Sequence, residues 1–177
     1  LELQLLNEWN DNNFPYIELE RKDIPTKNPL FGSFLSKLIF LLSDEGLSRL
    51  TFSKNQIKRC KKLRFWVHEI HNLGLDKLSE DERFQLHIDL KEDLPSLILF
   101  LEDKYMTAWL KRWKDPQDPL FHPSAPFDGH SLQKAFGIPP GPFLGELIRY
   151  LSKEKAYGRI SANKEAMEVA RKWTLEN

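Results

Sequence analysis

The chain has 177 residues, of which 41% are hydrophobic and 29% are charged, the composition of an ordinary soluble globular protein. Lysine plus arginine and aspartate plus glutamate both total 26, so net charge identifies no partner and only local clustering of charge can. A single cysteine, Cys60, excludes an internal disulfide and a zinc site built from cysteines, and it favours a cytoplasmic location. The longest apolar runs are too short to span a membrane, so we expect no membrane partner.

An apolar pattern is already present at the first residue. Leu1, Leu5, Leu6 and Trp9 recur at helical spacing. We therefore expect the chain to be a fragment that begins inside a helix of a longer protein. A processed or trimmed natural N-terminus is the alternative.

Helical signals recur along the chain and strand signals do not, which predicts an all-α fold. The sequence from Ser53 to Gln56 has the form of a capping box and predicts a helix that ends at Gly74. A second capping box opens another helix at Ser79, and a further helix should follow Pro95 and continue to about Lys114. A central core helix is predicted by an apolar stripe formed by Phe31, Phe34, Leu35, Leu38, Ile39 and Leu42.

The helix expected after Ser53 has a basic face. Its apolar stripe defines the buried side, and no acidic residue occurs from Ser53 to Val67. A lone lysine face is commonly only solvated, but it also suits the phosphate contacts that supply most affinity for nucleic acid. The apolar stripe comprises Ile57, Cys60, Leu63, Val67 and Ile70, and the opposite face carries Lys54, Lys58, Lys61 and Lys62, with Arg59 and Arg64 nearby.

Residues 115–129 are rich in proline and lack periodicity, which predicts a linker. We expect a helical body over residues 1–114 and a small helical tail over residues 130–177. The tail should contain a helix ending at Gly137, a second from about Pro142 to Ala156, and a last helix.

The start of the second tail helix is rigid. Pro139 and Pro140 favour an extended approach, Gly141 can act as the N-cap, and Pro142 suits the first helical position. Such a start presents free amides and the positive end of the helix dipole, which can bind a phosphate.

Gly145 interrupts the apolar run of this helix. A glycine without a Cβ lets a protein or nucleic-acid backbone approach closely, and Arg149 and Lys153 lie on the same side, where they could hold an anion. The alternative is that the prolines only set a turn and Gly145 lets a neighbouring helix pack closely.

These residues belong to an ordered set of short motifs: Asp128-Gly129-x-x-Leu132, Gly137-x-x-Pro140-Gly141-Pro142-x-Leu144-Gly145-x-Leu147, Gly158-x-Ile160 and Glu165-Ala166-Met167. Their order and spacing resemble the C-terminal region of bacterial class II tRNA nucleotidyltransferases, the CCA-adding enzymes, and of the related poly(A) polymerases. The match covers the chain from Asp128 onward. The preceding body resembles the family's RNA-binding domain only in pattern, with Leu94-Pro95 as its best local match.

The resemblance implies an all-α body and tail that bind tRNA. It implies that chemistry belongs to a catalytic head domain, in cis or in trans, which would use magnesium with ATP or CTP to add CC, A, CCA or poly(A). This chain lacks the Gly-Gly-x-Val-Arg-Asp and Asp-x-Asp segments of that domain. We therefore expect no catalytic residue, no metal site and no cofactor in this chain.

Two positions depart from the family pattern. Ser131 stands where the family has aspartate, and either residue can cap a helix. Ala162 stands where the family has threonine and cannot cap, so Ser161 or Asn163 would have to replace it.

Two other classes of function remain open from the sequence. One is a helical protein–protein interaction module without catalysis. The other is a degenerate helical hydrolase, suggested by His68 and His71 one turn apart, although no carboxylate set accompanies them.

Overall fold

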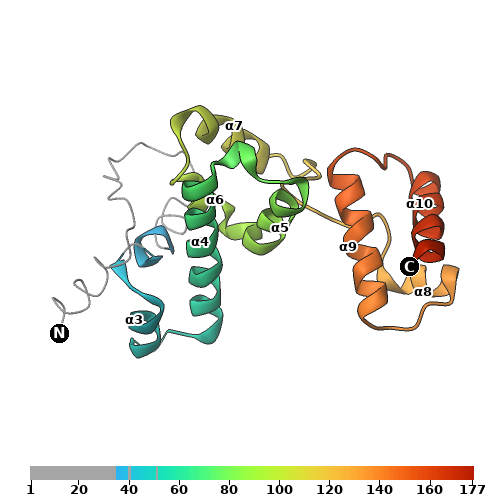
Figure 1. Ribbon diagram of the computed structural model, residues 1–177, viewed down its shortest axis with the longest axis horizontal. Coiled ribbons are helices and arrows are strands. Elements are labelled where there is room, and N and C mark those ends of the chain that lie inside the picture. The colour runs from blue at the N-terminus through green and yellow to red at the C-terminus, as the bar shows by residue number, and fades with distance from the viewer. Residues whose placement is uncertain (1–34, 40, 51) are drawn as a thin grey trace. The chain divides into compact units, whose positions relative to one another are not determined.

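The computed structural model describes residues 35–39, 41–50 and 52–177, and all regular structure within those ranges is helical (Figure 1). The prediction of an all-α fold is confirmed. The expected helix at Leu1 and the first part of the predicted core stripe lie outside the described residues. The rest of that stripe is helical over residues 35–39, where Leu35, Leu38 and Ile39 are buried.

The chain divides into two compact units. The first combines Leu1–Ser79 with Asp89–Lys111, and the second combines Glu80–Ile88 with Arg112–Asn177. This division differs from the body and tail expected from the sequence, because the segment Glu80–Ile88 belongs with the C-terminal unit. No helix in the described part of the chain is long and apolar enough to cross a lipid bilayer.

The first unit is organised around α4, the longest helix of the described chain, with α3 packed beside it (Figure 1). The predicted capping box at Ser53 is confirmed, since Ser53 Oγ accepts from the Gln56 amide over 3.2 Å and Gln56 Oε1 accepts from the Ser53 amide over 3.0 Å. Gly74 ends the helix at φ 86°, a conformation that favours glycine. The helical segments of this unit are α3 (Asp44–Arg49), α4 (Lys54–Leu73), η1 (Leu75–Lys77), η2 (Lys91–Asp93), α6 (Leu94–Ile98) and α7 (Asp103–Trp113, whose last two residues belong to the second unit).

The sequence predicts a single helix after Pro95, and this prediction is wrong because the structure has two helices there, α6 and α7. α6 ends at Ile98, and the amides of Phe100 and Leu101 bond to the carbonyls three residues back, at 2.9 and 3.2 Å. α6 is buried on nearly every side, whereas α7 buries no residue fully. The apolar periodicity therefore continues through a turn in which i to i−3 hydrogen bonds replace the helical ones.

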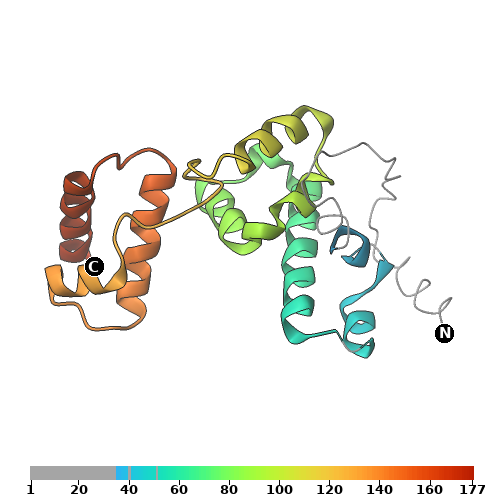
Figure 2. The ribbon, with the colours of Figure 1, turned by 180° about the vertical axis from the view of Figure 1, so that it is seen from behind.

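The second unit contains a three-helix group in which α9 packs against both α8 and α10 (Figure 1, Figure 2). Its helices are α8 (Gly129–Phe136), α9 (Pro142–Ala156) and α10 (Asn163–Glu176). The unit also contains residues 80–88 of α5 (Glu80–Leu90). The core of the three-helix group comprises Leu132, Ile138, Leu144, Leu147, Leu151, Ile160, Ala166 and Ala170.

The helix boundaries of the tail agree with the sequence prediction at two points. Gly137 ends α8 in the left-handed conformation, at φ 67°, and Pro142 begins α9 with Gly141 as its N-cap. The N-cap of α8 is Asp128, whose Oδ1 accepts from the Ser131 amide over 2.7 Å, so the capping ability of the residue at position 131 is not used there.

The N-cap residue of α10, Ala162, makes no side-chain hydrogen bond, so other residues stabilise the start of this helix. Glu165 Oε2 instead accepts from the Ser161 amide over 2.8 Å and from the Ser161 hydroxyl over 3.0 Å. These bonds hold the pKa of Glu165 below its usual range. The bonds between Glu165 and Ser161 thus order this helix start.

The proline-rich segment expected to be a linker is not helical, but it is anchored in the second unit. Phe121 is buried, and Asp118 Oδ1 accepts from the amides of Leu120 and Phe121 over 3.1 Å. Asp118 also binds the guanidinium of Arg112 over 2.7 Å. The segment therefore forms a turn with its own packing and hydrogen bonds.

Candidate nucleic-acid interface

The outer face of α4 carries the lysines predicted from the sequence. At about 100° per residue, Lys54, Lys58 and Lys61 fall within an arc of about 60°. Lys54 and Lys58 are exposed and have no ionic partner among the residues that the structure describes. Lys61 is 55% exposed, and its ammonium lies 3.9 Å from a carboxylate oxygen of Asp44.

The fourth lysine of the predicted set is engaged within the first unit. Lys62 Nζ donates to Asp89 Oδ1 over 2.6 Å. The same carboxylate accepts from the indole of Trp66 over 3.2 Å. Lys62 therefore helps to fix the buried side of α4 to Asp89 and is less available for an outside partner than Lys54 and Lys58.

The two arginines near this face also bind within the first unit. Arg59 Nε donates to Asp93 Oδ2 over 2.8 Å, and this hydrogen bond is the main reason that the pKa of Arg59 is raised. Arg64 pairs with Asp44 and donates to the Leu42 carbonyl. The basic face is therefore reduced to Lys54, Lys58 and Lys61, which we call the lysine face.

Phe65 lies on the lysine face, and the sequence analysis missed it. Eleven residues separate it from Lys54, about three helical turns, so it falls inside the same arc. Its relative exposure is 54%. The signal that could have found it is its spacing, since Lys54, Lys58, Lys61 and Phe65 follow one another at intervals of four, three and four.

The start of α9 has the predicted form. Gly141 makes no side-chain cap bond, and both Gly141 and Pro142 are exposed. A Cβ built on Gly145 would meet no atom within 4 Å, whereas one on Gly129 would lie 3.5 Å from Ile148. Close packing of a neighbouring helix therefore does not account for Gly145 within the described part of the chain, and the surface beside it is open.

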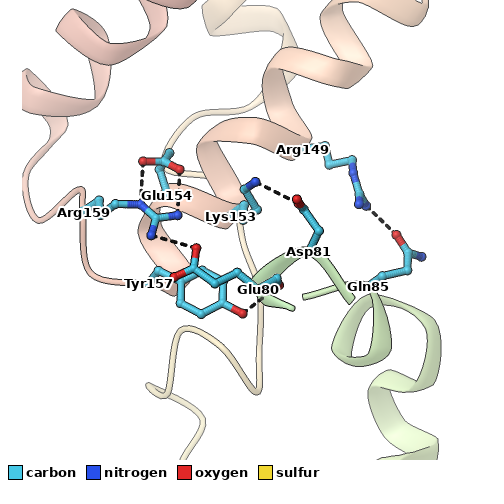
Figure 3. A network of polar contacts seen from close by, with 8 residues as sticks. All are labelled: Glu80, Asp81, Gln85, Arg149, Lys153, Glu154, Tyr157 and Arg159. Carbon is cyan, nitrogen blue, oxygen red and sulfur yellow. Dashed lines mark hydrogen bonds and ion pairs between the residues drawn. The ribbon is translucent and has the colours of Figure 1, made fainter. Parts of the chain in front are cut away.

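Arg149 and Lys153 do not converge on the start of α9. Figure 3 shows both side chains turned toward the first turns of α5. Arg149 Nη1 donates to Gln85 Oε1 over 2.6 Å, and Lys153 Nζ donates to Asp81 Oδ1 over 2.8 Å. The hydrogen bond from Lys153 is the main cause that lowers the pKa of Asp81. The predicted anion site is thus divided, with its two cations bound to α5.

The same contact continues at the end of α9 (Figure 3). Arg159 binds Glu80 over 3.0 Å and Glu154 over 2.8 Å, and the Tyr157 hydroxyl donates to the Glu80 carbonyl over 2.8 Å. The hydrogen bond to Glu154 is the main cause that raises the pKa of Arg159. Four polar side chains of the tail therefore hold the beginning of α5, a contact that no motif in the sequence indicated.

The histidines considered for a hydrolase site have other neighbours. His68 lies 3.7 Å from Glu69 and within 3.1 Å of the Asn72 amide. Among residues 35–39, 41–50 and 52–177, no group of three or more histidine, cysteine, aspartate or glutamate side chains could hold a metal ion.

No protein-family model matches this chain, and searches of curated proteins and of solved structures found no match either.

Proposed function

We propose that this chain is the RNA-binding C-terminal part of an enzyme of the tRNA nucleotidyltransferase or poly(A) polymerase type. In this proposal the chain binds tRNA in the cytoplasm and positions its 3′ end in a catalytic head domain, in cis or in trans. Nucleotide addition, with magnesium and ATP or CTP, belongs to that domain. The resemblance of the residues from Asp128 onward is what suggests this class.

The observation that carries the proposal is the exposure of Lys54, Lys58 and Lys61 on one side of α4. Other cations on this helix are bound to carboxylates of the first unit, but Lys54 and Lys58 have no such partner in the described chain. Lysines spaced one helical turn apart suit contact with successive phosphates. Such contacts need no particular base sequence, which suits a protein that binds every tRNA.

The open surface at Gly145 supports a second contact. With no atom within 4 Å of a Cβ placed there, a sugar–phosphate backbone has room to approach the exposed start of α9. Arg149 and Lys153 contribute in this proposal only when their contacts with α5 are exchanged for phosphate. The lysine face is therefore the primary contact, and the start of α9 is the secondary one.

The test is a fluorescence anisotropy titration of labelled tRNA with the 177-residue chain over a salt series, with duplex DNA of equal charge as competitor. We expect the chain to prefer tRNA over duplex DNA. The logarithm of its binding constant should fall linearly with the logarithm of the salt concentration. Lys54→Gln combined with Lys58→Gln should reduce the magnitude of that slope by about two.

The matched control is Lys164→Gln combined with Lys172→Gln, which removes the same charge from exposed positions of α10. Far-ultraviolet circular dichroism should be unchanged in both pairs. Equal losses in the two pairs would show that net charge rather than the lysine face determines binding. No binding of tRNA at low salt would contradict the proposal and favour a protein partner.

A further inference from the structure

We propose that Phe65 is a stacking platform for an unpaired base, so that the lysine face of α4 binds single-stranded RNA in preference to duplex. This inference rests on the proposed function and specifies the kind of RNA segment that α4 contacts.

The first observation is the position of Phe65. Phe65 is 54% exposed and lies one turn beyond Lys61, about 6 Å along the helix axis. A phenylalanine with half of its surface in water contributes little to the core, since the stabilisation from burial scales with the apolar area removed from water. An aromatic ring in line with three lysines matches the two components of a single-strand site, a cationic track and a face on which a base can stack.

The second observation is that the ring is supported by its neighbours. The ring centroids of Phe65 and Trp66 are 5.0 Å apart with an interplanar angle of 78°, a T-shaped contact. Trp66 is only 3% exposed, and its indole donates to Asp89, the carboxylate that also binds Lys62. The Phe65 ring thus rests against a side chain that is itself buried and hydrogen-bonded, an arrangement that favours stacking because less side-chain freedom is lost when a ring is already in contact.

The charge of the face determines the kind of partner. The helix itself carries no carboxylate from Ser53 to Val67, and its first one, Glu69, comes one turn after Phe65. In the described part of the chain, the carboxylate beside the face is that of Asp44, 3.9 Å from the Lys61 ammonium, which leaves Lys54 and Lys58 as its unbalanced charges. A polyanion is therefore favoured over a protein segment of mixed charge. The flat faces of bases in a duplex are covered by their neighbours, whereas unpaired nucleotides offer them for stacking. A lysine track that ends in an aromatic ring thus fits unpaired RNA.

The experiment compares two probes of equal charge, a labelled oligouridine and a blunt RNA duplex, titrated with the full chain over a salt series. Phe65→Leu should weaken oligouridine binding by about 5- to 100-fold without changing the salt slope, because no phosphate contact is lost. Duplex affinity should stay the same. Phe65→Tyr retains the aromatic face and should restore oligouridine binding.

Leu175→Ala is the matched control, since Leu175 is an exposed apolar residue of α10 with 82% exposure. Lys54→Gln with Lys58→Gln should weaken both probes and lower both salt slopes. The stacking inference is overturned if Phe65→Leu leaves the affinities for oligouridine and duplex unchanged, or lowers the two equally. The proposed function still stands in that case, provided that the double lysine variant weakens the binding of both probes. If the unaltered chain binds neither probe nor tRNA, the proposed function itself is overturned.

Discussion

The ammonium of Lys153 in α9 donates to a carboxylate oxygen of Asp81, in the first turn of α5, over 2.8 Å. The sequence predicts instead that this lysine contacts the RNA. Asp81→Asn removes the negative charge and releases Lys153. We expect tRNA affinity to rise several-fold and the salt slope to steepen by about one phosphate contact. The free energy of unfolding should fall by less than about 1 kcal/mol, because Asp81 is exposed and solvent screens the pair.

Glu168→Gln controls for net charge, since it removes an exposed carboxylate from α10. A similar rise in affinity in this variant would assign the Asp81 effect to overall charge. No change in either variant would mean that Lys153 stays away from the RNA even when its partner is removed.

Gly145→Ala should stabilise the protein by about 0.5–1 kcal/mol, because glycine inside a helix costs that much relative to alanine and the added Cβ meets no atom within 4 Å. Gly137→Ala is the contrasting variant, since Gly137 has φ 67° and alanine is strained there. Urea denaturation of both variants measures the two effects. Destabilisation by Gly145→Ala would show that its surroundings are less open than described.

Gly145→Leu should leave helicity unchanged and should not destabilise the protein, since leucine also favours a helix over glycine, but it should weaken tRNA binding because the larger side chain occupies the open surface at the start of α9. The measurement is tRNA anisotropy together with circular dichroism. An unchanged affinity would remove the start of α9 from the proposed interface and leave the lysine face as its only described part.

Asp128→Ala should lower the midpoint temperature of unfolding, because it removes the side chain that accepts from the Ser131 amide at the start of α8. Ser131→Ala should cost much less, since Ser131 is exposed and lies inside the helix. Thermal unfolding of the pair checks the assignment. A larger effect of Ser131→Ala would contradict the assignment of the cap to Asp128.

The stability of the protein should decrease as the pH falls below about 6.5, and His87 should be one cause. Burial, together with the charge of Arg112, lowers the pKa of His87 from 6.5 to about 3. The folded state therefore keeps the imidazole neutral. Its contribution to the free energy of unfolding is complete above the pKa of the unfolded state, 6.5, and is lost as the pH falls toward the folded-state pKa of about 3. The contribution of one such group has a limiting slope of about 1.4 kcal/mol per pH unit.

His87→Leu removes this titration, so its free energy of unfolding should depend less on pH between 6 and 4 than that of the unaltered protein, within about 1.4 kcal/mol per unit. His130→Leu, at an exposed position, is the control and should leave the pH dependence as it was. Urea titrations at several pH values give the comparison. Parallel curves for His87→Leu and the unaltered protein would contradict the assignment.

Local signals in the sequence predicted the helix boundaries well wherever the determining contacts are close in sequence. The capping box at Ser53, the left-handed Gly137 and the Gly141-Pro142 start each depend on residues within one turn. The lysine face was also predictable, because the 3.6-residue period alone places Lys54, Lys58 and Lys61 opposite the buried side.

What the sequence did not show depends on contacts between distant residues. The pairing of Lys153 with Asp81 joins residues 72 positions apart, and the break after Ile98 interrupts an apolar pattern that continues unchanged through it. No periodic pattern encodes such a pair. Phe65 was missed for another reason: apolar residues are usually assigned to a core, and only its exposure in the structure separates it from the buried stripe.

The attachment of residues 80–88 to the second unit has a consequence for anyone who cuts the chain at its prolines. A fragment that starts at residue 130 leaves Glu80 and Asp81 behind, so Lys153 loses its carboxylate and Arg159 keeps only Glu154 of its two. Such a fragment acquires unbalanced positive charge and would adsorb to nucleic acid of any kind. Its affinity for nucleic acid would therefore reflect the loss of these carboxylates and would differ from that of the whole chain.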